Sequence, residues 1–188
     1  MKKNTSLFGF LIAILAVAVS FGFYYLFLEK KNYFLVDNPT SNTYYFKINN
    51  GDEKIITSGQ SVKVNLNTGE NHIKVFDEKK SPLFDSSFVV KKTRGLLNIA
   101  HQDYYINRQY YGHITNKDSL LLLNKVMIDG TPYMGDLKHV NRLYCEDFYF
   151  NIDEDYNRLI KSIDKVESRT KIFRKQDFIN YYKEYYKF

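Results

Sequence analysis

Apolar residues form one uninterrupted run near the start of the chain. Residues 7–28 contain no charged side chain, and Ser20, Tyr24 and Tyr25 are the only polar interruptions. As a helix this run would be roughly 33 Å long at about 1.5 Å per residue, enough for a hydrocarbon core of about 30 Å. The pattern therefore predicts a transmembrane anchor helix over residues 7–28, after a short flank at residues 1–6.

A cleaved secretory signal is the competing interpretation of the same run. Lys2 and Lys3 precede the apolar stretch, and residues 18–20 (Ala-Val-Ser) form a small-residue cleavage site. Cleavage there would leave residues 21–28 as an apolar terminus in water, which favours an uncleaved signal anchor. Residues 29–31 (Glu-Lys-Lys) carry a net charge of only +1, so the flanking charges favour a cytoplasmic N-terminus. The expected location is the cell (inner) membrane, single-pass, with the bulk of the chain periplasmic.

After a spacer at residues 29–42, the pattern changes to short alternating segments separated by turn residues. Residues 49–52 (Asn-Asn-Gly-Asp) tolerate positive φ and predict a tight hairpin between two such segments. Regular turns between strands of five to eight residues are typical of a small antiparallel sandwich, here over residues 43–152. The expected strands are 43–48, 54–57, 61–66, 72–76, 84–90, 103–111, 120–128 and 143–152.

The last part of the chain, residues 153–188, is expected to be a helical and basic tail. Acidic residues at 153–155 suit a helix N-terminus, and apolar residues at helical spacing follow to Val166. A second helix is expected over residues 175–188. Residues 29–155 carry 16 Lys/Arg against 17 Asp/Glu, a net charge of −1, whereas residues 156–188 carry 9 against 4, a net charge of +5.

The tail is a candidate surface for an anionic membrane or an acidic partner. The alternative is that its tyrosine stripe packs on the sandwich and leaves a solvated basic face. The candidate residues of the tail are Arg174, Lys175, Phe178, Tyr182, Lys183 and Tyr185.

Five residues of the expected strand 103–111 form a candidate surface for a ligand or partner. Tyrosines interleaved with a basic residue can line a small-ligand pocket or stack on nucleic-acid bases. The segment contains no nucleic-acid-binding motif. No nucleic acid is expected as a partner. The residues are Tyr104, Tyr105, Arg108, Tyr110 and Tyr111.

Motifs that carry chemistry are missing from the sequence. His101, Asp103 and His113 could converge on a metal ion, but none of the four histidines has metal-ligand spacing. Cys145 lies in an apolar and aromatic segment, where a free cysteine usually packs as a small hydrophobe. We expect no catalytic residue, no cofactor and no metal, and therefore no enzyme.

The segment from Phe34 to Asp77 resembles a PEGA-type small β-sandwich. The resemblance rests on Asn38-Pro39-Thr40, the turn at 49–51, Ser58-Gly59-Gln60, and residues 68–75, which depart from the family's "pGxHxIxV" element by one inserted residue and a missing proline. The layout, including residues 95–98 and 110–112, also resembles envelope proteins of Bacteroidetes-type bacteria. The resemblance implies an Ig-like, surface-associated binding or spacer module and brings no catalytic residues.

The expected fold class is mainly β: an N-terminal transmembrane helix, a small antiparallel β-sandwich (Ig-like or PEGA-like) and a helical C-terminal extension. The expected function is a membrane-tethered, non-catalytic interaction or structural module of the bacterial cell envelope. Its expected partners are the lipid bilayer, through residues 7–28, and another envelope protein. An accessory subunit or small-ligand binder using residues 104–111 is the second hypothesis, and an envelope hydrolase is the third.

Overall fold

The computed structural model describes residues 5–25, 32–113, 125–156 and 166–186. The chain divides into two compact units, Met1–Asn32 and Tyr33–Phe188. The helix expected after residue 153 falls on residues 157–165, which lie outside the described residues, as does the start of the strand expected at 120–128.

The described part of the first unit is helix α1, Thr5–Phe23. Its 19 residues span about 28 Å at about 1.5 Å per residue. Within the described residues, no helix combines the length and the apolar character that crossing a membrane requires. The predicted transmembrane helix over residues 7–28 is therefore wrong, and so is the single-pass inner-membrane location that depended on it.

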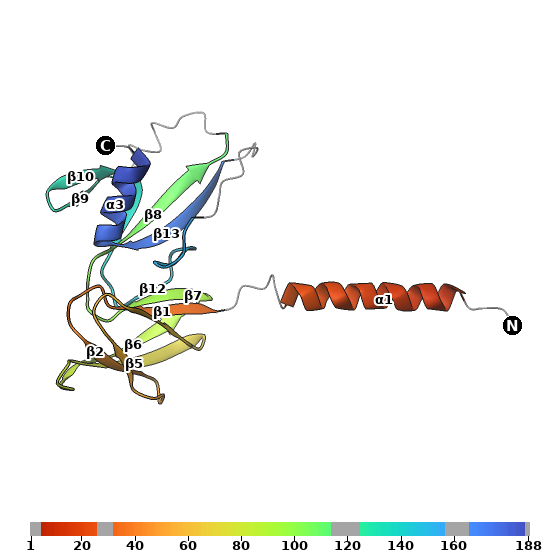
Figure 1. Ribbon diagram of the computed structural model, residues 1–188, viewed down its shortest axis with the longest axis horizontal. Helices are drawn as coiled ribbons and strands as arrows, with labels where there is room; N and C mark the ends of the chain where they lie inside the picture. The colour runs from red at the N-terminus through yellow and green to blue at the C-terminus, as the bar shows by residue number, and fades with distance from the viewer. Residues whose placement is uncertain (1–4, 26–31, 114–124, 157–165, 187–188) are drawn as a thin grey trace. The chain divides into compact units, whose positions relative to one another are not determined.

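The second unit is a stack of three β-sheets (Figure 1). The sheets are called B, A and C in the order of the stack, and their strands are given below. A hairpin and helix α3 pack on the outer face of sheet C. Sheet B contains β3 (Lys54–Ile56), β2 (Tyr44–Ile48), β5 (Gly69–Phe76) and β6 (Pro82–Val90). Sheet A contains β12 (Tyr144–Cys145), β7 (Arg94–Asn98), β1 (Tyr33–Asp37) and β4 (Ser61–Val64). Sheet C contains β11 (Asp136–Val140), β8 (Tyr104–Tyr111) and β13 (Glu167–Arg174); the hairpin is β9 (Lys125–Ile128) and β10 (Thr131–Met134), and α3 is Lys175–Tyr186.

Sheets A and B form a β-sandwich around one apolar core. Strand alternation sends one face of each sheet into this core, as the period-two pattern of the sequence predicts. The mainly β character of the chain is thereby confirmed. The core residues are Phe34, Val36, Phe46, Ile56, Val64, Leu66, Ile73, Val75, Phe88, Val90, Leu97 and Ile99.

The turn between β2 and β3 confirms the hairpin predicted at residues 49–52. Asn49 has a φ of 51°, and the Gly51 N–H donates to the Ile48 carbonyl at 3.0 Å. Tyr44 pairs with Ile56 in an antiparallel register. Asparagine tolerates this left-handed conformation better than other non-glycine residues do, which explains why the chain reverses here.

The two central strands of sheet A, β1 and β7, are buried on both faces, which the sequence pattern does not suggest. β1 and β7 run parallel, with Leu35 beside Leu96. These two leucines face sheet C, whereas Phe34 and Leu97 face sheet B. A strand buried on both faces has no polar face, so the sequence of β7 is apolar and shows no alternation. For the same reason β1 was missed, and it lies in the segment expected to be a spacer.

The C-terminal part is not the helical tail that the sequence predicted. Glu167–Arg174 is strand β13, which pairs with β8 over eight residues, and only α3 from Lys175 is helical within the described part of residues 153–188. Strand β13 completes sheet C, since Ile172 lies opposite Ile106 in the second core, between sheets A and C.

A buried carboxylate joins sheet A to sheet C. Asp37, at the end of β1, is 0% exposed. Arg174 binds it with two donors, Nε at 2.9 Å from Oδ2 and Nη2 to Oδ1, and the Tyr104 hydroxyl donates to Oδ2 at 2.6 Å. Arg174 also donates to the Gly59 carbonyl at 3.0 Å. Burial beside the Asp37 charge raises the pKa of Tyr104 far above its ordinary value, so the phenol remains a donor.

Replacing Asp37 with Ala should lower the free energy of unfolding by about 3–5 kcal/mol, because it leaves the Arg174 charge without its partner. Urea unfolding measures this change. The exposed Asp52→Ala serves as the control and should change stability by less than about 0.5 kcal/mol. Combining Asp37→Leu with Arg174→Met should recover most of the loss. Equal denaturation midpoints for Asp37→Ala and the control would contradict this role.

Candidate functional site

The face of sheet C that is turned toward sheet A has a packed end and an open end. At the packed end Tyr104, Ile106 and Ile172 join the second core. At the open end the same face lines a groove of about 380 Å³ together with the β6–β7 turn and the segment after β12. The lining residues are Lys92, Ile106, Arg108, Asp136, Lys138, Asp147 and Thr170.

Strand pairing brings the sheet C residues of this groove side by side. Arg108 in the central strand lies opposite Asp136 on one side and Thr170 on the other. Lys138 follows Asp136 by two residues and therefore points to the same face. Three strands thus hold a cation, a carboxylate and a hydroxyl in adjacent positions.

Asp147 is the carboxylate around which the cations of the groove gather. Its carboxylate accepts from Arg142 Nη2, lies 3.3 Å from Lys138 Nζ and lies 3.6 Å from Lys92 Nζ. Partial burial alone raises the pKa of Asp147, but the hydrogen bonds from Arg142 and Lys138 outweigh burial and lower it below its usual range. The carboxylate is therefore ionised at neutral pH and is shared by three cations from three segments.

Asp136 holds the other end of the groove. The Tyr110 hydroxyl donates to Asp136 Oδ2 at 2.7 Å, and Arg108 Nε lies 3.6 Å from the same oxygen. The hydrogen bond to Asp136 raises the pKa of Tyr110, so the phenol is neutral and donates. Arg108 is half-exposed, with 48% of its side chain accessible.

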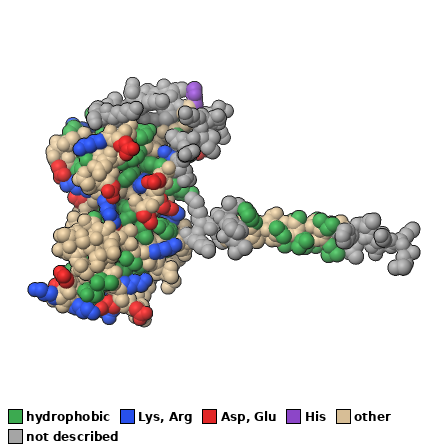
Figure 2. Space-filling view, in the orientation of Figure 1, with side chains coloured by type: hydrophobic (Ala, Val, Ile, Leu, Met, Phe, Trp, Pro, Cys, Tyr) green, Lys and Arg blue, Asp and Glu red, His purple; other side chains and the backbone are tan. Residues whose placement is uncertain are grey.

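The charges of the groove do not cancel. Three cations (Lys92, Arg108 and Lys138) and two carboxylates (Asp136 and Asp147) line it, a net charge of +1, and Arg142 contacts Asp147 from beside the groove. Ammonium and guanidinium groups are the donors that bind phosphate and carboxylate oxygens best. Basic and acidic side chains are interleaved on the face shown in Figure 2, so an excess of one sign has to be counted locally. This groove is the candidate binding site.

Two of the five residues expected to form a ligand surface on residues 104–111 lie in or beside the groove. Arg108 lines it, and Tyr110 reaches Asp136. Tyr104 lies on the same face but is 1% exposed in the Asp37 network. Tyr105 and Tyr111 lie on the opposite face, where Tyr105 stacks on Phe178 and the Tyr111 hydroxyl donates to Glu167 at 2.9 Å.

The six tail residues do not form one surface. Arg174 binds Asp37, and Lys175 binds Asp129 at 2.6 Å. Phe178 is 1% exposed in the apolar core between sheet C, the β9–β10 hairpin and α3. The Tyr182 ring lies against Tyr133, and Lys183 and Tyr185 are exposed. Most of the aromatic stripe packs on sheet C, which is the alternative that the sequence left open.

Sequence reasoning missed the groove cations at Lys92, Lys138 and Arg142. A partial signal existed, because Asp136 and Lys138 alternate in a strand and must share a face, as Arg108 and Tyr110 do. The sequence does not predict that these two strands pair, since a segment of more than twenty residues separates them.

The described residues contain no group of three or more His, Cys, Asp or Glu side chains that could hold a metal ion. Asp103 binds His139 at 2.7 Å, whereas the His101 ring lies tilted against Phe84, with the ring centres 5.0 Å apart. Cys145 is 3% exposed, and its Sγ lies 3.6 Å from Arg142 Nη2. The sequence predicts no metal site, and His101, Asp103 and Cys145 each lie against structural neighbours.

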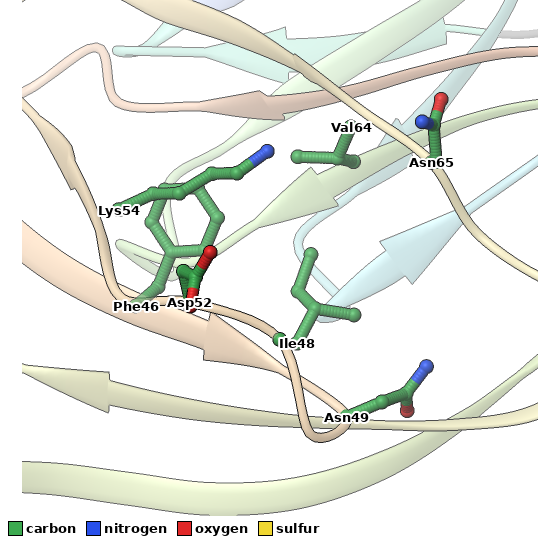
Figure 3. A pocket seen from close by; sticks show the side chains of 8 residues that line it. Phe46, Ile48, Asn49, Asp52, Lys54, Val64 and Asn65 are labelled. Atoms are coloured by element: carbon green, nitrogen blue, oxygen red, sulfur yellow. The ribbon is translucent and has the colours of Figure 1, made fainter.

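A second, smaller hollow of about 150 Å³ lies where edge strands β3 and β4 of the sandwich part. Figure 3 shows Phe46, Ile48 and Val64 around it, with the side chains of Asn49 and Asn65 at its rim. Gly51, Asp52 and Lys54 complete the lining. Its single Asp and single Lys cancel, so this hollow has an apolar floor and no net charge.

Comparison with known proteins gives no match. No protein-family model, no curated protein and no solved structure matches the chain. The resemblance of residues 34–77 to PEGA-type modules therefore stays a prediction.

A polar cluster at the start of β1 contains Tyr33, whose pKa is strongly shifted. The Tyr33 hydroxyl donates to Asp153, and Arg94 binds Glu154 through both terminal nitrogens. The Arg94 guanidinium lies 5.5 Å from the centre of the Tyr33 ring. Burial, with the hydrogen bond to Asp153, raises the pKa of Tyr33 from 10.0 to about 12.

The Tyr33 contact should be lost at alkaline pH. The phenol keeps its proton to about pH 12 in the folded chain and to about pH 10 in the unfolded chain. Its contribution to stability is therefore complete below pH 10 and disappears as the pH rises through about 12. Urea unfolding of the wild type and Tyr33→Phe should give a stability difference that shrinks across this interval. A difference that does not vary with pH would contradict the assignment.

Proposed function

We propose that this chain is a non-catalytic binding module that holds an anionic group in the groove of sheet C. One observation carries the proposal: a single carboxylate, Asp147, is contacted by three cations, Lys92, Lys138 and Arg142. With Asp136 counted as well, the lining of the groove keeps a net charge of +1. The remaining charge attracts an anion, and the groove offers it the space.

The geometry of the groove supports binding of oxygen anions in particular. The cationic groups of the lining come from a turn and from two strands of sheet C, so they reach the space from more than one side. Lys92 and Lys138 are 58% and 60% exposed, which lets their ammonium groups turn from Asp147 to an incoming ligand. A phosphate or carboxylate would replace part of the internal contact with Asp147.

Several features favour binding over catalysis. The carboxylates of the groove are engaged by cations and by the Tyr110 hydroxyl, which fixes their charge rather than preparing them for proton transfer. The proposal keeps the second hypothesis from the sequence, a ligand binder that uses residues 104–111. Within that segment it assigns the contact to Arg108 and Tyr110.

Inorganic phosphate titrated into the full chain, followed by amide chemical shifts, tests the proposal. Lys138→Gln should weaken binding, whereas Asp147→Asn should tighten it because the internal competitor for the cations is lost. Exposed charge pairs contribute about 0.2–1 kcal/mol, so each change should be about 1.4-fold to fivefold. The opposite signs distinguish a role in binding from general damage to the fold.

Lys125→Gln is the matched control, because Lys125 is an exposed lysine on β9, outside the groove lining. It should leave phosphate affinity unchanged. Raising the ionic strength should weaken binding to the wild type, since exposed charges are screened. Shift changes spread over the whole surface, or equal effects of Lys138→Gln and Lys125→Gln, would refute the groove as the site.

A further inference from the structure

Strand β6 is a long edge strand. It spans nine residues, Pro82–Val90, and β5 is its only hydrogen-bonded neighbour among the described strands. An edge of this length presents a row of backbone donors and acceptors to another strand. Protein edges of this kind usually carry lysines or prolines along their length, whereas here the single proline is at the first position and Asp85 is the only charge.

The backbone groups that face the free edge of β6 can be identified from β5. The His72 carbonyl accepts from Asn49 N–H and the His72 N–H donates to Asn49 Oδ1, so the backbone of His72 points away from β6. Ser87 is the partner of His72 in the register. In an antiparallel ladder both members of such a pair point outward, so Ser87 faces the free edge, and Asp85 and Val89 do so by alternation.

The side chains of β6 leave apolar surface in water at both ends of the strand. Leu83 is 49% exposed and Val89 is 52% exposed, both on the outer face of sheet B. Phe84 and Phe88 point inward, toward the sandwich core. The exposed apolar residues thus lie symmetrically about Ser86, three residues to either side.

The sequence of β6 is complementary to itself when a second copy runs antiparallel and is centred on Ser86. Leu83 then lies opposite the partner's Val89, and Phe84 lies opposite the partner's Phe88. Asp85 lies opposite the partner's Ser87, so no carboxylate directly faces another. In this register the outward backbone groups identified above also meet one another, which is what ladder hydrogen bonds require.

We infer that β6 binds β6 of a second copy of this chain and joins two B sheets into one eight-stranded sheet across a two-fold axis. Antiparallel pairing of identical strands is self-complementary, as a two-fold interface must be. It places the apolar pairs of Leu83 and the partner's Val89 on both sides of the axis. Asp85 is compensated within each copy by His72 and by Lys74, whose Nζ lies 3.1 Å away.

Sedimentation of the full chain over a concentration series tests the interface. The wild type should sediment as a dimer at high concentration, and the double variant Leu83→Lys with Val89→Lys should sediment as a monomer, because like charges then lie near the interface. Ile55→Lys is the matched control: Ile55 is 50% exposed on the outer face of the same sheet, but on β3 at the other edge. It should leave the dimer intact.

A cysteine at the axis tests the register. Opposed residues at Ser86 form a non-hydrogen-bonded pair about 4.5 Å apart between Cα atoms, within reach of a disulfide. Ser86→Cys should give a covalent dimer with oxidised glutathione, whereas Ser81→Cys, five residues from the axis, should not. A wild type that is monomeric at every concentration, or a dimer that survives both lysines, would overturn the inference. Cross-linking at Ser81 but not Ser86 would overturn the register.

Discussion

The burial of one carboxylate constrains the second unit of this protein. Asp37 is 0% exposed, and a buried charge is tolerated only when a counter-charge and hydrogen-bond donors surround it. Arg174 and Tyr104 supply these groups from sheet C, at sequence separations of 137 and 67 residues. Strand β13 must therefore end where its last residue reaches the end of β1, and α3 begins at the next residue. Any shift of sheet C over sheet A would leave the carboxylate unpaired.

The groove follows from this constraint. Tyr104 and Arg174 pair with each other across sheet C and hold one end of the sheet against sheet A. Further along the same face, Arg108 and Thr170 are opposed, and they lie beyond the packed end. There the polar segment around Asp147 faces the sheet. The apolar end of sheet C therefore supplies stability, and the open end keeps charged groups close together without burying them.

The sequence predicts the parts of the fold in which alternation has a polar side. The hairpin at Asn49 and Gly51 and the strands of sheet B have that property. β1 and β7 were missed because both of their faces are buried, and β13 was missed because its polar and apolar residues depend on two different neighbours, sheet A and α3. The sequence predicts part of the candidate site, because Arg108 and Tyr110 are two residues apart in one strand and therefore share a face. Lys138 and Arg142 are only nine and five residues from Asp147 in the sequence, but their contacts need the intervening segment to fold back, and Lys92 comes from a distant segment.

The edges of the three sheets differ in how they are closed. The outer edge of β13 is covered by the chain itself, since the N–H groups of Tyr149 and Phe150 donate to the Thr170 carbonyl and the Ile172 N–H donates to the Phe150 carbonyl. The edge strands of sheet A are two and four residues long, too short to present an extended template. Strand β6 has a β-bulge only at its Pro82 end, opposite Val75 and Phe76, and neither protection over residues 84–90. Strand β6 leads directly into the turn that carries Lys92, one of the cations lining the groove, so the free edge and the groove are neighbours along the chain.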